Sequence, residues 1–524
     1  MTQAVGGADA TTDTEAPLLL SSTAGTPPPL LAGAPRRNRF AFVCATLASV
    51  TTMLHGYNLT LMSGVELFMR EDVALTDAEV EVLAGSMNVF MLASILAAGW
   101  VADHLGRRRT LVLANAFFMA GALAMSLGTS FAALMAARFV TSVGSGFARV
   151  VAPVYNAEIS PPSTRGVLSS MLDMFINVGI LLSYVSNYAF SGLPVHLGWR
   201  VMYGIGVIPP VFIAAGVLFM PESPWWLAMQ GRHGDARAVL MRMSDTPADA
   251  DLQLREIKRA VADAEPPPAA ARHSGGAGVW KQLLVRRPST CVRRILTCVL
   301  GLHFFVQASG VDAILLYSPL VFKAVGMASN SAILGATVAT GAVKTCFVLV
   351  GMLFTDRLGR RPLLLASTAG VATTTAALAV TLHEHDVFVT GDGRGMPGVG
   401  AGRRGHVLDR VRSSSPATAA ACLALVLAVV ATYSIGYGSV VSAYSAEVLP
   451  LRLRAQGSSL AMAVNRLTCG VVSMTFISLA DGITMPGCFF LYAAVTAAAF
   501  VFVYTWLPET KGRSLEDMEV LFHK

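Results

Sequence analysis

The sequence predicts an all-α, polytopic membrane protein with twelve transmembrane helices in two six-helix bundles and a helical linker domain between them. Three observations lead to this class. Hydrophobic residues make up 54% of the 524 residues and charged residues only 14%, which is too apolar for ordinary soluble domains. Apolar runs of about 20 residues, the length at which a helix crosses about 30 Å of hydrocarbon, recur along the chain. Unusual strings also occur twice in the same order, which indicates a duplicated unit.

The apolar runs form two groups of six, separated by a polar stretch. The first group lies near 40–64, 83–103, 110–128, 132–154, 166–190 and 200–220. The second group lies near 292–320, 329–354, 362–381, 416–443, 455–478 and 485–507. The connections around 103–110 and 354–362 are short enough to require very tight turns.

These spans divide the chain into five parts: a disordered tail (1–38), a first bundle (39–220), a linker domain (221–291), a second bundle (292–507) and a C-terminal tail (508–524). The linker is rich in Arg and Ala and contains helical patterns such as "DLQLREIKRAV", so we expect a soluble helical domain. The first tail has no basic region followed by an apolar one, so no signal peptide is predicted.

Basic residues between the spans indicate the orientation. Short clusters such as "APRRNR", "GRRR", "GRR" and "KGR" all fall on one side of the predicted membrane, together with the linker. The positive-inside rule places that side, and both termini, in the cytosol. The loop 382–415 is an exception, because it holds five arginines on the other side, but long loops carry little weight in this rule. We expect the plasma membrane, with the vacuolar membrane as the alternative.

The remaining composition excludes several classes of protein. The net charge of +7 is accounted for by the basic clusters, so no nucleic-acid partner is expected. Seven cysteines, six of them in apolar stretches and without C-x-x-C spacing, indicate neither a metal site nor a disulfide framework. No set of nucleophile, base and oxyanion donors is recognisable. We therefore expect no enzyme activity and no cofactor, with a small solute and membrane lipid as partners.

Three strings are duplicated. The first, Asp-x-Leu-Gly-Arg-Arg, spans 103–108 and 356–361. The second is Tyr-x-Ala-Glu-x-x-Pro followed by Arg, and the third is Pro-Glu-Ser/Thr at the end of each half. The spacing within each string is identical in both copies, and the loop 382–415 supplies the extra length of the second half. The chain is therefore predicted to be a duplicated six-helix unit.

The charged residues of these strings lie at cytosolic helix ends, where they can form an ion-pair network. Guanidinium groups form paired hydrogen bonds with carboxylates and suit such a bridge. A network that must break for one face to open acts as a gate; the alternative is static anchoring of helix ends by long basic side chains. The gating candidates in the first half are Asp103, Arg107, Arg108, Glu158, Arg165 and Glu222. In the second half they are Asp356, Arg360, Arg361, Glu447, Arg454 and Glu509.

Polar residues inside the spans mark a solute path, because each one is costly in hydrocarbon. The fifth span holds Asp173 and Asn177, four apart and so on one helix face. The seventh span holds His303 and Gln307, which also share a face, with Asp312 beyond them. Further candidates are Lys344 in the eighth span and Asn465 in the eleventh. Such side chains suit polyols, whose hydroxyls both donate and accept hydrogen bonds.

Several ordered motifs resemble the sugar porter family of the major facilitator superfamily. They include "GWVADHLGRRR", "PESPWWL", "QASGVDAILLYSP", "YSAEVLPLRLRAQG" and "LPETKGRSLEDME". Within the family, "FINVGILLSYVSNYAF" and "AVNRLTCGVVSMTFISL" look most like plant polyol and monosaccharide transporters. The resemblance covers about 38–524 and implies a major facilitator fold, in which two six-helix bundles rock about a midplane site.

The resemblance also assigns roles to individual positions. It implies that Asp173, Gln307, Asp312, Lys344 and Asn465 contact substrate. Tyr317 matches an aromatic residue of the extracellular gate, and Ser442 stands where the family carries a Trp that packs on the sugar.

Four positions depart from the family pattern. Val306 replaces a glutamine, Ser439 a helix-bending proline, Ser442 the stacking tryptophan and Trp225 an arginine of the cytosolic network. These departures predict altered specificity, slower turnover or loss of transport. They motivate one alternative function, a sensor that binds a sugar or polyol without transporting it.

Asn58 in the first span is the residue on which coupling depends. The resemblance implies an Asp here in proton-coupled sugar porters, paired with an arginine of the fourth span, which is Arg138 in this chain. An amide cannot titrate, so the sequence predicts facilitative transport of a polyol or monosaccharide by alternating access. The alternative is a proton symporter that uses another acid, such as Asp173, and so takes protons as a second ligand.

Overall fold

The computed structural model describes residues 39–160, 165–244, 246–264, 290–327, 329–391, 416–449 and 454–511. Every regular element in these ranges is an α-helix, and they contain no strand, which confirms the predicted all-α class. The predicted tail 1–38, the loop residues 392–415 and most of the C-terminal tail lie outside the described residues.

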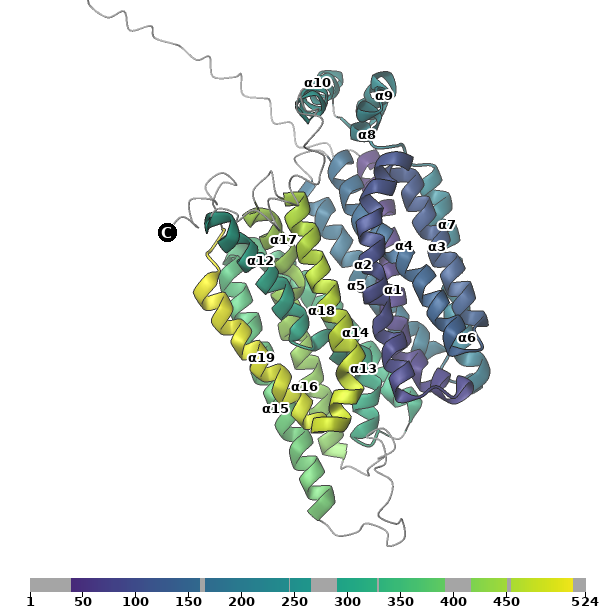
Figure 1. The fold of residues 1–524 in the computed structure, drawn as a ribbon, viewed down its shortest axis with the longest axis vertical. Helices are drawn as coiled ribbons and strands as arrows, with labels where there is room; N and C mark the ends of the chain where they lie inside the picture. Colours follow the sequence, from purple (N-terminus) through teal and green to yellow (C-terminus); the bar gives the residue numbers. More distant parts are fainter. Residues whose placement is uncertain are drawn as a thin grey trace, which may run out of the picture. The chain divides into compact units, whose positions relative to one another are not determined.

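Seven helices form the first half of the chain (Figure 1). They are α1 (Arg39–Val73), α2 (Asp77–Leu105), α3 (Arg107–Leu127), α4 (Phe131–Ile159), α5 (Arg165–Ala189), α6 (Val195–Ile205) and α7 (Ile208–Leu218). The sixth predicted span, 200–220, is in fact two helices that start earlier, at Val195. The break falls before Pro209 and Pro210, which lack the backbone N–H that a continuous helix would use.

The second half repeats this arrangement with more breaks. Its helices are α12 (Thr290–Ala308), α13 (Val311–Ala324), α14 (Asn330–Leu358), α15 (Arg360–Gly391), α16 (Pro416–Ile435), α17 (Tyr437–Val448), α18 (Arg454–Ile483) and α19 (Met485–Trp506). The seventh predicted span breaks at Gly310, which has a φ of 74°, a conformation that glycine adopts without strain. The tenth breaks at Gly436. The ninth, predicted as 362–381, continues as helix to Gly391.

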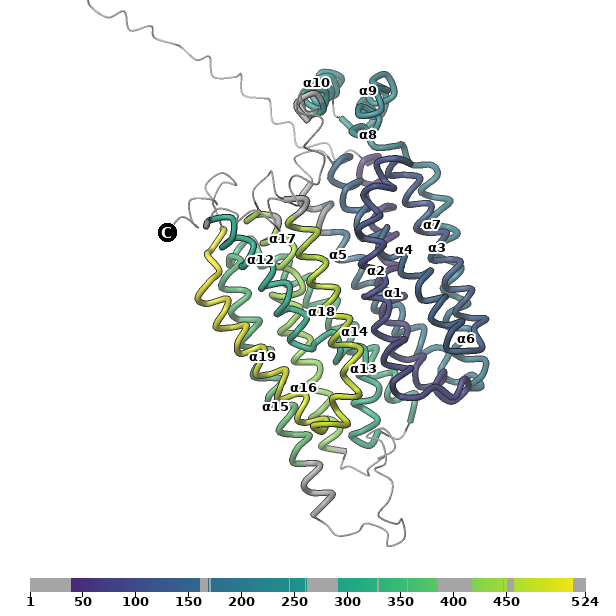
Figure 2. The backbone as a smooth tube through the Cα atoms, in the orientation of Figure 1, coloured from purple at the N-terminus to yellow at the C-terminus, as the bar shows by residue number. Residues whose placement is uncertain are grey.

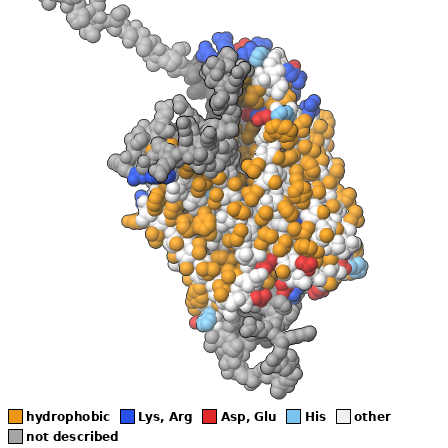
Figure 3. Space-filling model, viewed as in Figure 1, with side chains coloured by type: hydrophobic (Ala, Val, Ile, Leu, Met, Phe, Trp, Pro, Cys, Tyr) orange, Lys and Arg blue, Asp and Glu red, His pale blue; other side chains and the backbone are white. Residues whose placement is uncertain are grey.

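The surface matches a membrane environment. Eleven helices or helix pairs in the described part of the chain are long and apolar enough to cross a bilayer. The one predicted span without a counterpart among the eleven is the fifth, 166–190, which corresponds to α5, a 25-residue helix that packs against α1. Figure 3 shows hydrophobic side chains over the sides of the bundles and Lys and Arg side chains gathered at the end that carries α8 to α10.

Three short helices follow the first bundle: α8 (Pro224–Met229), α9 (His233–Met243) and α10 (Pro247–Ala264). They pack around their own apolar cluster, which includes Trp226, Leu240 and Ile257. Arg237 of α9 donates two hydrogen bonds to Asp251 of α10, and these bonds lower the pKa of the Asp251 carboxyl. We call the end of the bundles that carries these helices the linker face, and the other end the opposite face.

The two halves meet along three helix pairs. α2 packs against α18, α5 against α14, and α1 against α13, and these pairs can be followed in the backbone trace of Figure 2. The interface is therefore built from corresponding helices of the two repeats. A central cavity remains between the two halves beside these helix pairs.

The predicted tight turns are two matching glycine turns on the linker face. Gly106 separates α2 from α3 with φ 92° and ψ 160°, and Gly359 separates α14 from α15 with φ 97° and ψ 163°. Only glycine adopts this region readily. A Cβ atom on Gly106 would also collide with the carboxylate of Glu222, and one on Gly359 would lie 3.0 Å from Glu509 Oε2.

We expect Gly106→Ala to destabilise the protein by about 1–3 kcal/mol, because the backbone at this turn excludes side chains. The melting temperature of the purified protein in detergent should fall by several degrees. Gly99→Ala in α2 is the matched control, since a Cβ at Gly99 meets open space. Equal melting temperatures for the two variants would contradict this account of the turn.

Candidate functional site

A cavity of ≈ 140 Å³ lies between the two halves. Helices α1, α4 and α5 line it from the first half, and α12, α13, α14, α16, α17 and α18 line it from the second. A solute in this cavity would therefore contact both repeats.

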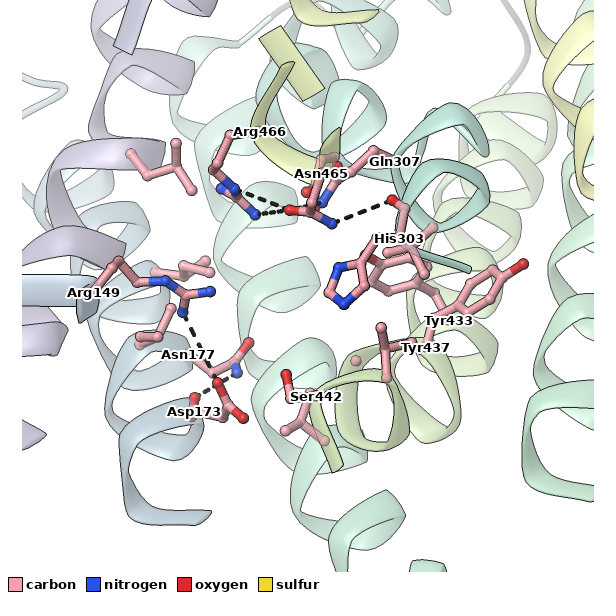
Figure 4. A pocket seen from close by; sticks show the side chains of 18 of the residues that line it. Arg149, Asp173, Asn177, His303, Gln307, Tyr433, Tyr437, Ser442, Asn465 and Arg466 are labelled. Atoms are coloured by element: carbon pink, nitrogen blue, oxygen red, sulfur yellow. Dashed lines mark hydrogen bonds and ion pairs between the residues drawn. The ribbon is translucent and has the colours of Figure 1, made fainter. Parts of the chain in front are cut away.

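All eight residues that the sequence predicts to bind substrate line this one cavity, several of them labelled in Figure 4. They are Asp173, Asn177, His303, Gln307, Asp312, Lys344, Ser442 and Asn465. They come from six different helices, so the fold gathers side chains that are up to 292 positions apart, from Asp173 to Asn465. Their roles in binding remain predictions.

Asn465 is the centre of the polar contacts on the second half. Its Oδ1 accepts a hydrogen bond of 3.3 Å from Gln307 Nε2 and others of 3.0 and 2.5 Å from Arg466 Nε and Nη2. Its Nδ2 donates to the backbone oxygen of His303 at 3.4 Å. Arg466 also donates to Asn88 Oδ1 across the interface at 3.2 Å. These contacts hold Gln307 and Asn465 in fixed positions at the cavity wall (Figure 4).

Several lining side chains have buried polar atoms that no described residue satisfies. Gln307 Oε1, His303 Nδ1, His55 Nδ1, Arg149 Nε and the Tyr437 hydroxyl have no hydrogen-bond partner in the part of the chain that the structure describes. Buried polar groups are normally paired, so a cluster of unpaired ones in a cavity indicates a site for polar ligand atoms or water. Both hydrogen-bond donors and acceptors are available.

The charged side chains of the cavity pair only loosely. Arg149 Nη1 lies 4.0 Å from Asp173 Oδ1, and Lys344 Nζ lies 3.7 Å from Asp312 Oδ1. Both distances exceed that of a hydrogen bond. Asn177 bonds to the backbone oxygen of Asp173 at 2.8 Å, which fixes its amide on the same helix face.

Sequence reasoning missed His55, Arg149, Tyr433 and Tyr437 as lining residues. The signal for Arg149 and His55 was present, because each is a titratable residue inside an apolar run, the same criterion that found Asp173. The two tyrosines carry no such signal, since tyrosine is common in apolar helices.

In the tenth span, other features stand in place of the tryptophan and the proline that the family pattern would have. Tyr433 and Tyr437 line the cavity beside Ser442, with ring centroids 5.7 Å apart, so aromatic surface is present although the tryptophan is absent. The helix still breaks, at Gly436, without the proline. Ser439 Oγ donates to the backbone oxygen of Ile435 at 2.5 Å, a contact that itself bends helices. Val306 lines the cavity as an apolar residue.

Asn58 and Arg138 are both buried and close together, but their side chains do not pair. Asn58 Nδ2 donates to the backbone oxygen of Leu54 at 2.9 Å. Arg138 Nη1 donates to the backbone oxygen of Asn58 at 3.1 Å and contacts Met87 Sδ at 3.6 Å. Arg138 Nε and Nη2 have no partner among the described residues. The arginine therefore sits beside an amide that does not neutralise it.

In the first half, the duplicated strings meet on the linker face. Arg107 donates from Nε and Nη2 to the two oxygens of Glu158, both at 3.1 Å, and its Nη1 lies 3.1 Å from Asp103 Oδ1. Glu222 Oε1 accepts from the backbone N–H groups of Arg107 and Arg108 at 2.9 and 3.0 Å. The contacts of Glu222 involve no side chain at position 225, so Trp225 leaves them intact.

The second half repeats this cluster. Arg360 Nε and Nη2 donate to Glu447 Oε1 at 3.1 and 2.7 Å. Glu509 accepts from the backbone N–H groups of Arg360 and Arg361, both at 3.0 Å. The side chains of Arg165, Asp356 and Arg454 lie outside the described residues. The sequence therefore identified two symmetry-related clusters, each within one half; their gating role remains a prediction.

The cavity is closed on the opposite face by contacts within the second half and between the halves. Within the second half, Tyr317 OH donates to the backbone oxygen of Ser473 at 2.7 Å, and its ring stacks on Phe476 with centroids 5.1 Å apart. Glu81 of α2 accepts hydrogen bonds from the backbone N–H of Ile477 and from the backbone N–H and hydroxyl of Ser478. Tyr317, the predicted gate aromatic, is fully buried in this closure.

Comparison with known proteins gives consistent matches over most of the chain. A family model described as "Sugar (and other) transporter" matches residues 44–522. Polyol transporter 5 of Arabidopsis thaliana is 45% identical over 513 residues, which cover 95% of this chain and 91% of the relative. Putative polyol transporter 1 of the same organism is 47% identical over 492 residues, with 93% and 92% covered. The inward-open xylose transporter XylE of E. coli has a TM-score of 0.71 at 22% identity, covering 92% of this chain and 100% of that structure.

Proposed function

The chain belongs to the sugar transporter family of the major facilitator superfamily, and from this premise we propose that it moves a polyol or monosaccharide across a membrane by facilitative alternating access. Members of this family are integral membrane transporters rather than enzymes. The proposal adds the substrate class, the absence of proton coupling through Asn58, and a plasma-membrane location with both termini in the cytosol.

The observation that carries the proposal is the cavity between the halves. Eight polar residues predicted from the sequence line the cavity. Several buried polar atoms of its lining have no hydrogen-bond partner among the described residues. A polyol supplies a hydroxyl for each of them, because a hydroxyl can donate and accept at once. Arabidopsis relatives named polyol transporters at 45% and 47% identity support this class of substrate.

Alternating access is supported by the asymmetry of the contacts between halves. Ser63 and Glu81 seal the opposite face, since each hydrogen bonds to a backbone group or hydroxyl of the other half. The two arginine–glutamate clusters on the linker face each stay within one half. This pattern fits an inward-facing state, in which the halves separate on the linker face and hold together on the other.

Uptake by vesicles that contain the purified protein tests the proposal. We expect labelled sorbitol, mannitol, xylitol, inositol or a hexose to equilibrate across the vesicle membrane without accumulating, at any imposed pH gradient. Binding without flux for every one of these solutes would support the sensor instead.

The second candidate function, proton symport, is favoured by one observation, the Arg149–Asp173 pair in the cavity at 4.0 Å. A carboxyl group beside a guanidinium can take up a proton when the pair separates. In this case Asp173→Asn should abolish accumulation driven by a pH gradient but preserve exchange of labelled for unlabelled substrate. Glu79→Gln, on the exposed surface of α2, is the control. Accumulation that persists in Asp173→Asn would exclude this acid as the proton site.

A further inference from the structure

The charge of the cavity is not that expected for a neutral sugar. Three lining residues are cationic, Arg149, Lys344 and Arg466, and two are anionic, Asp173 and Asp312. With the histidines neutral, the lining carries a net charge of +1. A positive charge in a site of low dielectric concentrates anions there.

Arg149 of α4 is the least satisfied of these groups. Its guanidinium lies 4.0 Å from Asp173 and 3.9 Å from Met462 Sδ, and its Nε has no partner within the described ranges. The side chain is only 18% exposed. A buried guanidinium normally forms paired hydrogen bonds with a carboxylate or phosphate. In Figure 4 the group points into the cavity from the first half.

Arg466 of α18 faces the same cavity from the second half (Figure 4). Its hydrogen bonds go to the amide oxygens of Asn465 and Asn88, so no carboxylate balances its charge through them. The two arginines therefore present like charges from opposite halves. An anion between them would offset their repulsion and favour closure of the halves around it.

We propose that this cavity takes a polyhydroxylated carboxylate, an aldonic or uronic acid, whose carboxylate binds Arg149 and whose hydroxyls bind Gln307, Asn465 and Asn177. The inference deepens the proposed function, since it names the substrate class of the same site. A single negative charge matches the net charge of +1, whereas a phosphate monoester carries almost two. A planar carboxylate also suits the fork of an arginine.

Proteoliposomes with the full-length protein test the inference, with labelled gluconate and glucuronate as probes and sorbitol as the neutral reference. We expect gluconate to be transported and to compete with sorbitol. An inside-positive membrane potential should accelerate gluconate uptake and leave sorbitol uptake unchanged, because only gluconate carries charge.

Arg149→Gln should raise the KM for gluconate about tenfold or more, because charge-assisted hydrogen bonds are about twice as strong as neutral ones. Its KM for sorbitol should rise less than its KM for gluconate, because sorbitol offers this position a neutral hydroxyl instead of a carboxylate. Arg149→Lys keeps the charge and should retain most gluconate uptake, and Asp173→Asn should lower the KM for gluconate by removing a negative charge. Arg232→Gln, at the exposed residue just before α9, is the matched control for loss of an arginine.

Sorbitol uptake without gluconate uptake would overturn the inference and leave the proposed function standing. Equal gluconate uptake by Arg149→Gln and the unmodified protein would also overturn it. If neither gluconate nor any of the neutral solutes of the uptake test above is transported, the inference and the proposed function fail together. Should Arg149→Gln not fold, the retained gluconate uptake expected for Arg149→Lys and the lowered KM expected for Asp173→Asn decide the question.

Discussion

Asn58→Asp is expected to make the transporter accumulate its substrate when the outside is more acidic than the inside. The new carboxylate would lie beside Arg138, whose Nε and Nη2 are buried and bond to no residue that the structure describes. A carboxylate in that position can pair with the guanidinium in one state and bind a proton in another. With one proton per substrate, a gradient of one pH unit supports accumulation of about tenfold at most.

The measurement is the ratio of labelled substrate inside and outside vesicles at imposed pH gradients, with exchange at equal pH as a check on folding. Asn115→Asp is the matched control, because Asn115 is also buried in the first half but bonds to Thr51 and to the backbone of Leu111. The double variant Asn58→Asp, Arg138→Gln should lose the accumulation. If the unmodified protein already accumulates substrate with proton influx, our interpretation of Asn58 is wrong.

The sequence predicted the fold and the lining of the cavity because both depend on the cost of polar groups in hydrocarbon. Asp173, Gln307 and Lys344 stand out in apolar runs, and the duplicated strings indicate the repeat. The same rule applied to Arg149 would have found it. The family resemblance assigns roles only to certain positions, and Arg149 is not one of these positions.

Other features depend on tertiary contacts that no linear pattern encodes. Glu81 lies in the first turns of α2, where an acidic residue normally favours the helix dipole and needs no partner. Only the packing of α2 against α18 places its carboxylate on the backbone of Ile477. The break at Gly436 was likewise not predicted, because the absence of proline at position 439 indicated a continuous helix.

Glu81→Gln is expected to loosen the closure on the opposite face and shift the protein toward an outward-facing state. Glu81 is 2% exposed and accepts three hydrogen bonds from Ile477 and Ser478 of the other half. Tyr317 donates to Ser473, four residues before Ile477. In a regular helix, the backbone oxygen of Ser473 would accept a hydrogen bond from the backbone N–H of Ile477. Tyr317 bonds to the first of these two groups and Glu81 to the second, so the two side chains hold α18 from two sides. A neutral amide accepts weaker hydrogen bonds than a carboxylate.

Weakening three such bonds by about 0.5 kcal/mol each would shift the balance of states about tenfold. The shift can be measured in a background without native cysteines, as the rate at which Ser63→Cys reacts with a membrane-impermeant maleimide. Ser63 is fully buried in the closure, where its hydroxyl donates to the backbone oxygen of Leu315 at 3.3 Å. Glu79→Gln is the matched control, because glutamine preserves the capping box that Glu79 forms with Thr76. If the Glu81 carboxylate only stabilised α2, its replacement would leave the labelling rate unchanged. A labelling rate for Glu81→Gln equal to that for Glu79→Gln would therefore show that Glu81 does not hold the halves together.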